Sequence, residues 1–149
     1  MRTTILWIHA LGGGAWVGAA IAFVIGASAS GGDDEAGFAM IRRVAPAINR
    51  IGLGAMLFIV ITGVVNIYLA GMTRRFQFSN AFVVLLSMKI ALLGGMYFML
   101  IQSWRAQHEL MASDRERAQR AARRLIAYSI VIAGCGGLAL LLGLWLLGA

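Results

Sequence analysis

The chain has 149 residues, 60% of them hydrophobic, with a mean hydropathy of +0.83 and a formal net charge of +7 at pH 7. The single cysteine, Cys135, lies in an apolar run, which excludes an intrachain disulfide and a Cys/His zinc site and predicts a packing residue. The basic residues lie mostly between apolar runs, so we attribute the charge to membrane orientation and expect no nucleic-acid binding.

Four apolar runs are each long enough to cross a bilayer as a helix, which takes about 20 residues. They are residues 4–28, 45–71, 81–104 and 125–148. We therefore predict an all-α integral membrane protein, folded as a single four-transmembrane-helix domain over residues 1–149. The first run is longer than the about 7–15 apolar residues of a signal peptide, so we expect a transmembrane helix there.

The connections around the second run carry helix signals. In residues 30–44, a Gly-rich turn and acidic residues precede Phe38, Ile41 and Val44 at helical spacing, which predicts a short amphipathic helix. Pro46 is expected to kink or break that helix near the membrane face. Ser79 or Asn80 is expected to cap the third helix, because both residue types favour the N-cap position.

The connection after the third run is rich in arginine, namely Arg105, Arg115, Arg117, Arg120, Arg123 and Arg124. The positive-inside rule places it in the cytoplasm, which gives an N-out/C-out topology. Good helix formers predict that helices 3 and 4 extend into the cytoplasm. A capping box of Ser113 with Glu116, and the i,i+4 pair Glu116–Arg120, predict that the fourth helix starts near Asp114. We expect the arginine cluster to contact anionic lipids, with a soluble partner as the alternative.

Three polar side chains stand out within the apolar runs: His9, Asn66 and Lys89. With a helical rise of about 1.5 Å per residue, the predicted topology places all three in one outer-leaflet layer. An intramembrane lysine costs roughly 2.5–3.5 kcal/mol, so such groups normally face the bundle interior or a polar cavity. The structural alternatives are snorkelling of Lys89, a packing role for His9 and an interhelical hydrogen bond for Asn66. Trp16, Met96 and Thr62 would line the floor of a pocket, with core packing as the alternative for Trp16 and Met96.

Several segments resemble a known family in order and spacing. They are Leu6-Trp7-Ile8-His9-Ala10-Leu11, Ala15-Trp16-Val17-Gly18, Thr62-Gly63-Val64-Val65-Asn66 and Met88-Lys89-Ile90-Ala91-Leu92. Together they look like the membrane domain of the CopD-like (copper resistance protein D) family, which is distantly similar to the HemJ-type membrane protoporphyrinogen oxidases. The segment that follows the first-helix tryptophan in HemJ-type enzymes is longer, aromatic and basic, and it is missing here.

The resemblance implies copper homeostasis in the bacterial inner membrane, with copper bound or passed at the outer-leaflet site. It implies His9, Trp16, Asn66 and Lys89 as cofactor-binding residues, and we expect His9 and Met96 as metal ligands, because thioether and imidazole suit Cu(I). No catalytic residue is assigned, and we expect binding or transport rather than catalysis.

Two alternatives remain open. The HemJ relationship implies haem b, with His9 as an axial ligand and Lys89 beside a propionate. The third possibility is a cofactor-free accessory subunit of a larger membrane complex, and the glycine-rich helices also permit a homo-oligomer. His108 occupies a place where some short relatives have a histidine, although an exposed histidine in an arginine-rich helix is the simpler interpretation.

Overall fold

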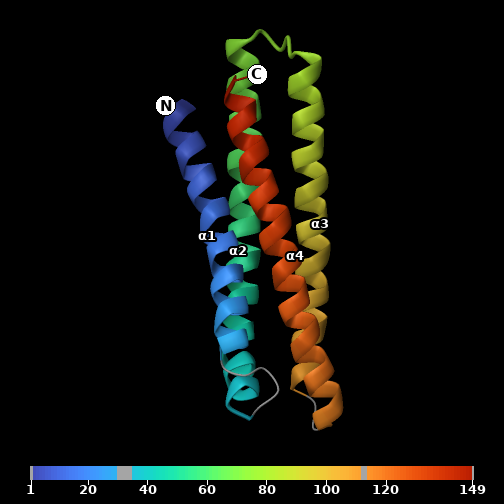
Figure 1. The fold of residues 1–149 in the computed structure, drawn as a ribbon. Coiled ribbons are helices and arrows are strands. Elements are labelled where there is room, and N and C mark those ends of the chain that lie inside the picture. Colours follow the sequence, from blue (N-terminus) through green and yellow to red (C-terminus); the bar gives the residue numbers. More distant parts are fainter. Residues whose placement is uncertain (1, 30–34, 112–113, 149) are drawn as a thin grey trace.

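The computed structural model describes residues 2–29, 35–111 and 114–148, which form four long helices with no strand among them (Figure 1). The helices are α1 (Arg2–Ala29), α2 (Glu35–Thr73), α3 (Asn80–Leu110) and α4 (Arg115–Gly148). Each is long and apolar enough to span a membrane. The predicted all-α four-helix membrane bundle is therefore confirmed. The expected Gly-rich turn at Gly31 and Gly32 and the expected Ser113 cap lie outside the described residues.

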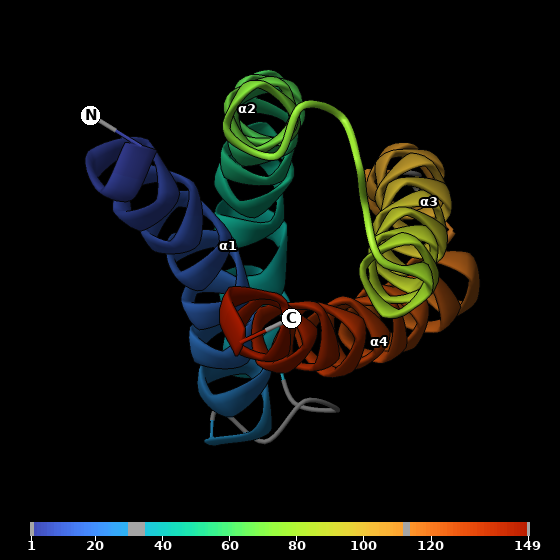
Figure 2. The same ribbon diagram turned by 90° about the horizontal axis from the view of Figure 1, so that it is seen from above.

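Consecutive helices run antiparallel. Along the bundle axis, α1 and α3 lie on opposite sides, with α2 and α4 between them (Figure 2). Helix α1 packs on α2 and α4, and α3 packs mainly on α4, whereas α2 and α3 share a smaller contact. Both chain ends and the α2–α3 loop lie at one end of the bundle, here called the terminal end (Figure 1). We call the other end, at Ala29, Glu35, Leu110 and Arg115, the arginine-rich end.

The helix starts agree with the cap residues. Ser79 is the N-cap of α3, and its Oγ accepts a hydrogen bond from the Phe82 N–H at 3.2 Å. At the start of α4, Asp114 Oδ1 accepts from the N–H of Glu116 at 3.0 Å. Glu116 also pairs with Arg120 at 3.5 Å. The prediction that the fourth helix begins near Asp114 is therefore confirmed, and α3 and α4 both continue beyond their apolar runs.

Helix α2 contains Pro46, where a kink or a break was expected. It runs without interruption from Glu35 to Thr73, so the amphipathic segment is the first part of α2 and the expected break is absent. Proline removes one backbone donor and crowds the carbonyl four residues earlier. The flanking residues Ile41, Ala45 and Asn49 are all buried, and this packing holds the helix on both sides of the proline.

The buried side chains form two clusters along the bundle. Small residues dominate the one nearer the arginine-rich end, which contains Phe23, Ala27, Ile41, Ala45, Ala106, Leu110, Ala121, Ala122 and Leu125. The middle cluster consists of Trp16, Ala20, Met96, Leu100 and Ile132. Large apolar side chains such as Leu11 and Trp145 are about two-thirds exposed, as a lipid-facing surface requires.

Candidate functional site

The candidate site is built around His9, which lies on α1 toward the terminal end. Its Nδ1 lies 2.8 Å from Thr62 Oγ1 on α2. Thr62 Oγ1 also lies 2.7 Å from the backbone carbonyl oxygen of Phe58, one turn back on the same helix. An added Cβ at Gly63 would lie 3.4 Å from His9 Cε1, so the glycine lets the imidazole approach the α2 backbone. The imidazole is thus held against α2.

The hydrogen bonds favour one tautomer of His9. A carbonyl oxygen only accepts, so the Thr62 hydroxyl donates its proton to Phe58 and accepts the Nδ1–H of His9. This arrangement uses both protons and leaves Nε2 of His9 unprotonated. Nε2 therefore carries a free lone pair, the state in which histidine ligates a metal.

Lys89 lies at a similar level on α3. An added Cβ at Gly143 would lie 3.1 Å from Nζ of Lys89, so the ammonium lies over the α4 backbone. Lys89 and His9 also interact electrostatically. The two side chains therefore place a positive charge and an open imidazole nitrogen in one region of the terminal half.

Asn66 is the third residue of this region, and it lies one turn from Thr62 toward the terminal end. Both Nδ2 and Oδ1 of its side chain are buried, and neither has a hydrogen-bond partner within the described part of the chain. An unpaired buried polar group costs about 1–3 kcal/mol, and most such groups in folded proteins are satisfied by protein, water or a ligand. The carboxamide is therefore available to a bound molecule.

Trp16 and Met96 lie together, in a different layer from His9. Both belong to the middle core cluster, and Trp16 is only 1% exposed. Trp16 is seven residues along α1 from His9, which corresponds to roughly 10 Å of helical rise. Around this cluster pack Met56, Met99 and Cys135, so one layer gathers several sulfur atoms. The described contacts join Met96 to Trp16 rather than to His9, and a shared His9–Met96 metal site stays a prediction.

The remaining candidates lie elsewhere. His108 is exposed near the arginine-rich end. Within residues 2–29, 35–111 and 114–148, no group of three or more His, Cys, Asp or Glu side chains is arranged to hold a metal ion.

A buried polar network that the sequence analysis missed joins α2 to α3. Asn49 Nδ2 donates to Gln107 Oε1 at 2.7 Å, and Ser103 Oγ donates to Asn49 Oδ1 at 2.6 Å. Asn49 and Ser103 are 2% and 4% exposed, so these bonds lie in the core. The signal available in the sequence was Asn49, a polar residue within the second apolar run, on the face of its helix that packs against the third helix. The network therefore joins α2 and α3 in the half of the bundle nearer the arginine-rich end.

Comparisons of the chain with known protein families, with curated proteins and with solved structures find no match. The CopD-like resemblance therefore stays a prediction that rests on the motifs alone.

Proposed function

We propose that this protein binds haem b in the terminal half of its membrane bundle, where His9 would ligate the iron and Lys89 would pair with a propionate. The observation that carries the proposal is the His9–Thr62 hydrogen bond, because it leaves Nε2 of a half-buried imidazole free beside a cation. In globins and peroxidases a single histidine of the protein holds the haem iron. A haem bound in this way would supply one-electron redox chemistry. We further propose that the protein resides in the bacterial inner membrane with its arginine-rich end in the cytoplasm.

The donor set at this site fits haem b better than a copper ion. Lys89 repels a bound cation but attracts the carboxylates of a haem. The buried carboxamide of Asn66 can donate to or accept from a polar substituent. Cu(I) would instead need further soft ligands close to His9, and Met96 packs one layer away.

Copper homeostasis is the second candidate, and a different observation favours it. Met56, Met96, Met99 and Cys135 all pack in the middle layer of the bundle, which offers thioether and thiol groups of the kind that select Cu(I). A copper function would therefore use this sulfur layer, with His9 as an entry ligand.

Analysis of the purified protein separates these functions. The expected result is a Soret band and a pyridine haemochrome of haem b in the parent, loss of both in His9→Ala, and weaker retention of haem in Lys89→Gln. His108→Ala is the matched control, since His108 lies at the other end of the bundle, and it should retain haem. Copper in near-stoichiometric amount without haem would support the second candidate. A colourless, metal-free protein would point to the accessory-subunit role and contradict the haem proposal.

A further inference from the structure

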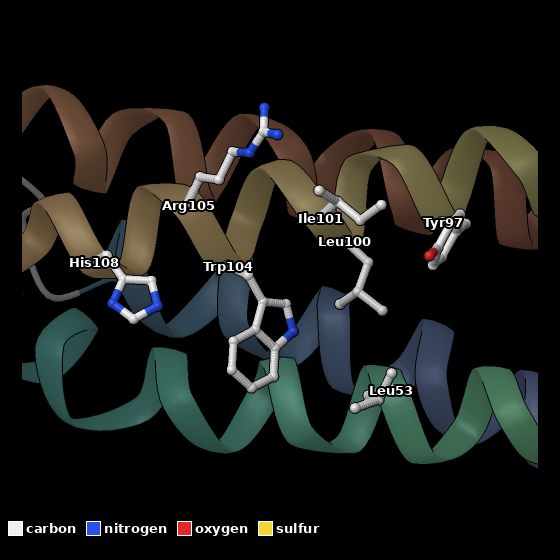
Figure 3. Close-up of a pocket in the computed structure, with 7 residues that line it drawn as sticks. All are labelled: Leu53, Tyr97, Leu100, Ile101, Trp104, Arg105 and His108. Atoms are coloured by element: carbon white, nitrogen blue, oxygen red, sulfur yellow. The ribbon is translucent and has the colours of Figure 1, made fainter.

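A groove opens on the outer surface of the α2–α3 seam, away from His9. It has a volume of about 410 Å³ and is lined by Leu53, Tyr97, Leu100, Ile101, Trp104, Arg105 and His108 (Figure 3). Leu53 and Tyr97 are about half exposed, so the groove faces the surroundings of the bundle. Its lining is apolar along most of its length, and Arg105 and His108 form its end toward the arginine-rich end of the bundle.

The orientation of the side chains defines the two parts of the groove. Trp104 and His108 point from α3 toward α2, with Leu53 on the facing helix (Figure 3). The Arg105 guanidinium extends away from α2 and donates to Gln102 Oε1 at 3.2 Å. Gln102 is neutral, so this bond leaves the positive charge of Arg105 uncompensated. Arg50 lies one turn from Leu53 on α2, and it is exposed as well.

The pairing of the arginines is uneven around the bundle. On α4, Arg115, Arg117, Arg120 and Arg124 pair with Glu35, Asp114, Glu116 and Glu109, respectively. By contrast, Arg50 and Arg105 have no carboxylate within ion-pair distance among the described residues. The uncompensated positive charge near the groove therefore lies on α2 and α3, beside its polar end.

We propose that this groove is a binding site for one anionic glycerophospholipid, with an acyl chain along Leu53, Tyr97 and Trp104 and the phosphate at His108, attracted by the positive charges of Arg105 and Arg50. The apolar part of the groove matches an acyl chain, and the cationic and hydrogen-bonding groups at its end match a phosphate at the membrane surface. Arginine suits phosphate because its guanidinium offers several donors in a planar fork. Tryptophan and tyrosine are favoured at the membrane interface because their amphipathic rings fit at the level of the lipid headgroups. The site is independent of the proposed haem.

Trp104 makes the proposal measurable by fluorescence. In a Trp7→Phe/Trp145→Phe background, the two most exposed tryptophans are absent and the buried Trp16 gives a constant signal. The protein is reconstituted into vesicles of phosphatidylcholine that contain either dibrominated phosphatidylglycerol or dibrominated phosphatidylcholine, whose bromines quench a tryptophan they touch. A further Trp104→Phe variant supplies the baseline. We expect phosphatidylglycerol to exchange onto the Trp104 site about fivefold more favourably than phosphatidylcholine.

Two charge-matched variants decide the assignment. Arg50→Gln/Arg105→Gln should abolish the preference for phosphatidylglycerol, and the control Arg117→Gln/Arg120→Gln, which removes the same charge from paired arginines of α4, should keep it. Equal quenching by the two lipids, no quenching of Trp104, or equal loss of preference in both double variants would each overturn the proposal. All four arginines are exposed, so folding of the variants is expected and is checked by size-exclusion chromatography.

Discussion

Substitution of Thr62 by valine is expected to shift the tautomer equilibrium of the His9 imidazole away from the Nδ1–H form. Valine keeps the shape of threonine but removes the oxygen that lies 2.8 Å from Nδ1. A net hydrogen bond contributes about 0.5–1.5 kcal/mol, so the ratio of the Nδ1–H to the Nε2–H form should fall about two- to twelvefold. Thr62→Ser keeps the hydroxyl and should keep the parent ratio.

Nitrogen NMR of protein labelled with ¹⁵N-histidine measures this ratio directly, because protonated and unprotonated ring nitrogens resonate far apart. The chain has two histidines, and His108→Asn assigns the signals of His9. The measurement uses cofactor-free protein at a pH where the imidazole is neutral, so it is independent of haem binding. A parent spectrum with the proton on Nε2, or a Thr62→Val spectrum identical to that of the parent, would refute the assignment of Nε2 as the free nitrogen.

Two further predictions concern the packing of the bundle. Asn49→Leu removes two interhelical hydrogen bonds, each worth about 0.6–1.7 kcal/mol in a membrane protein, and should lower the free energy of unfolding by about 1–3 kcal/mol. Ser103→Ala removes only one of these bonds and should lower it by less. Unfolding in detergent measures both values. Equal costs for both variants would contradict this account. Gly136→Ala places a methyl group against Val17, so a loss of about 1–3 kcal/mol is expected in the same assay. Gly134→Ala is the control, because its added Cβ meets nothing within 4 Å. An equally large loss of stability in Gly134→Ala would contradict the explanation that close packing at Gly136 causes the loss.

The helices themselves could be predicted from the sequence because membrane-spanning length and helix caps are local properties. Apolar runs of sufficient length located all four helices, and Ser79 marked the start of α3. The effect of Pro46 was not predictable in this way. A missing backbone donor is a local signal, but the packing of Ala45 and Asn49 that keeps α2 continuous comes from other helices.

The candidate site could be predicted only in part. His9, Asn66 and Lys89 stand out because polar residues are rare within apolar runs. The sequence also contains Thr62, but only the relative rotation of α1 and α2 pairs it with His9. Asn49 and Ser103 were not singled out because each lies near the end of its apolar run, and Gln107 lies just beyond the third run, where polar residues are ordinary. Their mutual contact depends on the α2–α3 packing.

The haem proposal requires that the free Nε2 of His9 bind the haem iron. Haem titration of the apoprotein tests it, with the parent compared to His9→Gly in the absence and presence of added imidazole. We expect a Soret shift with a clear end point in the parent, little binding in His9→Gly, and recovery when imidazole fills the space left by the side chain. Equal haem binding by the parent and by His9→Gly without imidazole would contradict it.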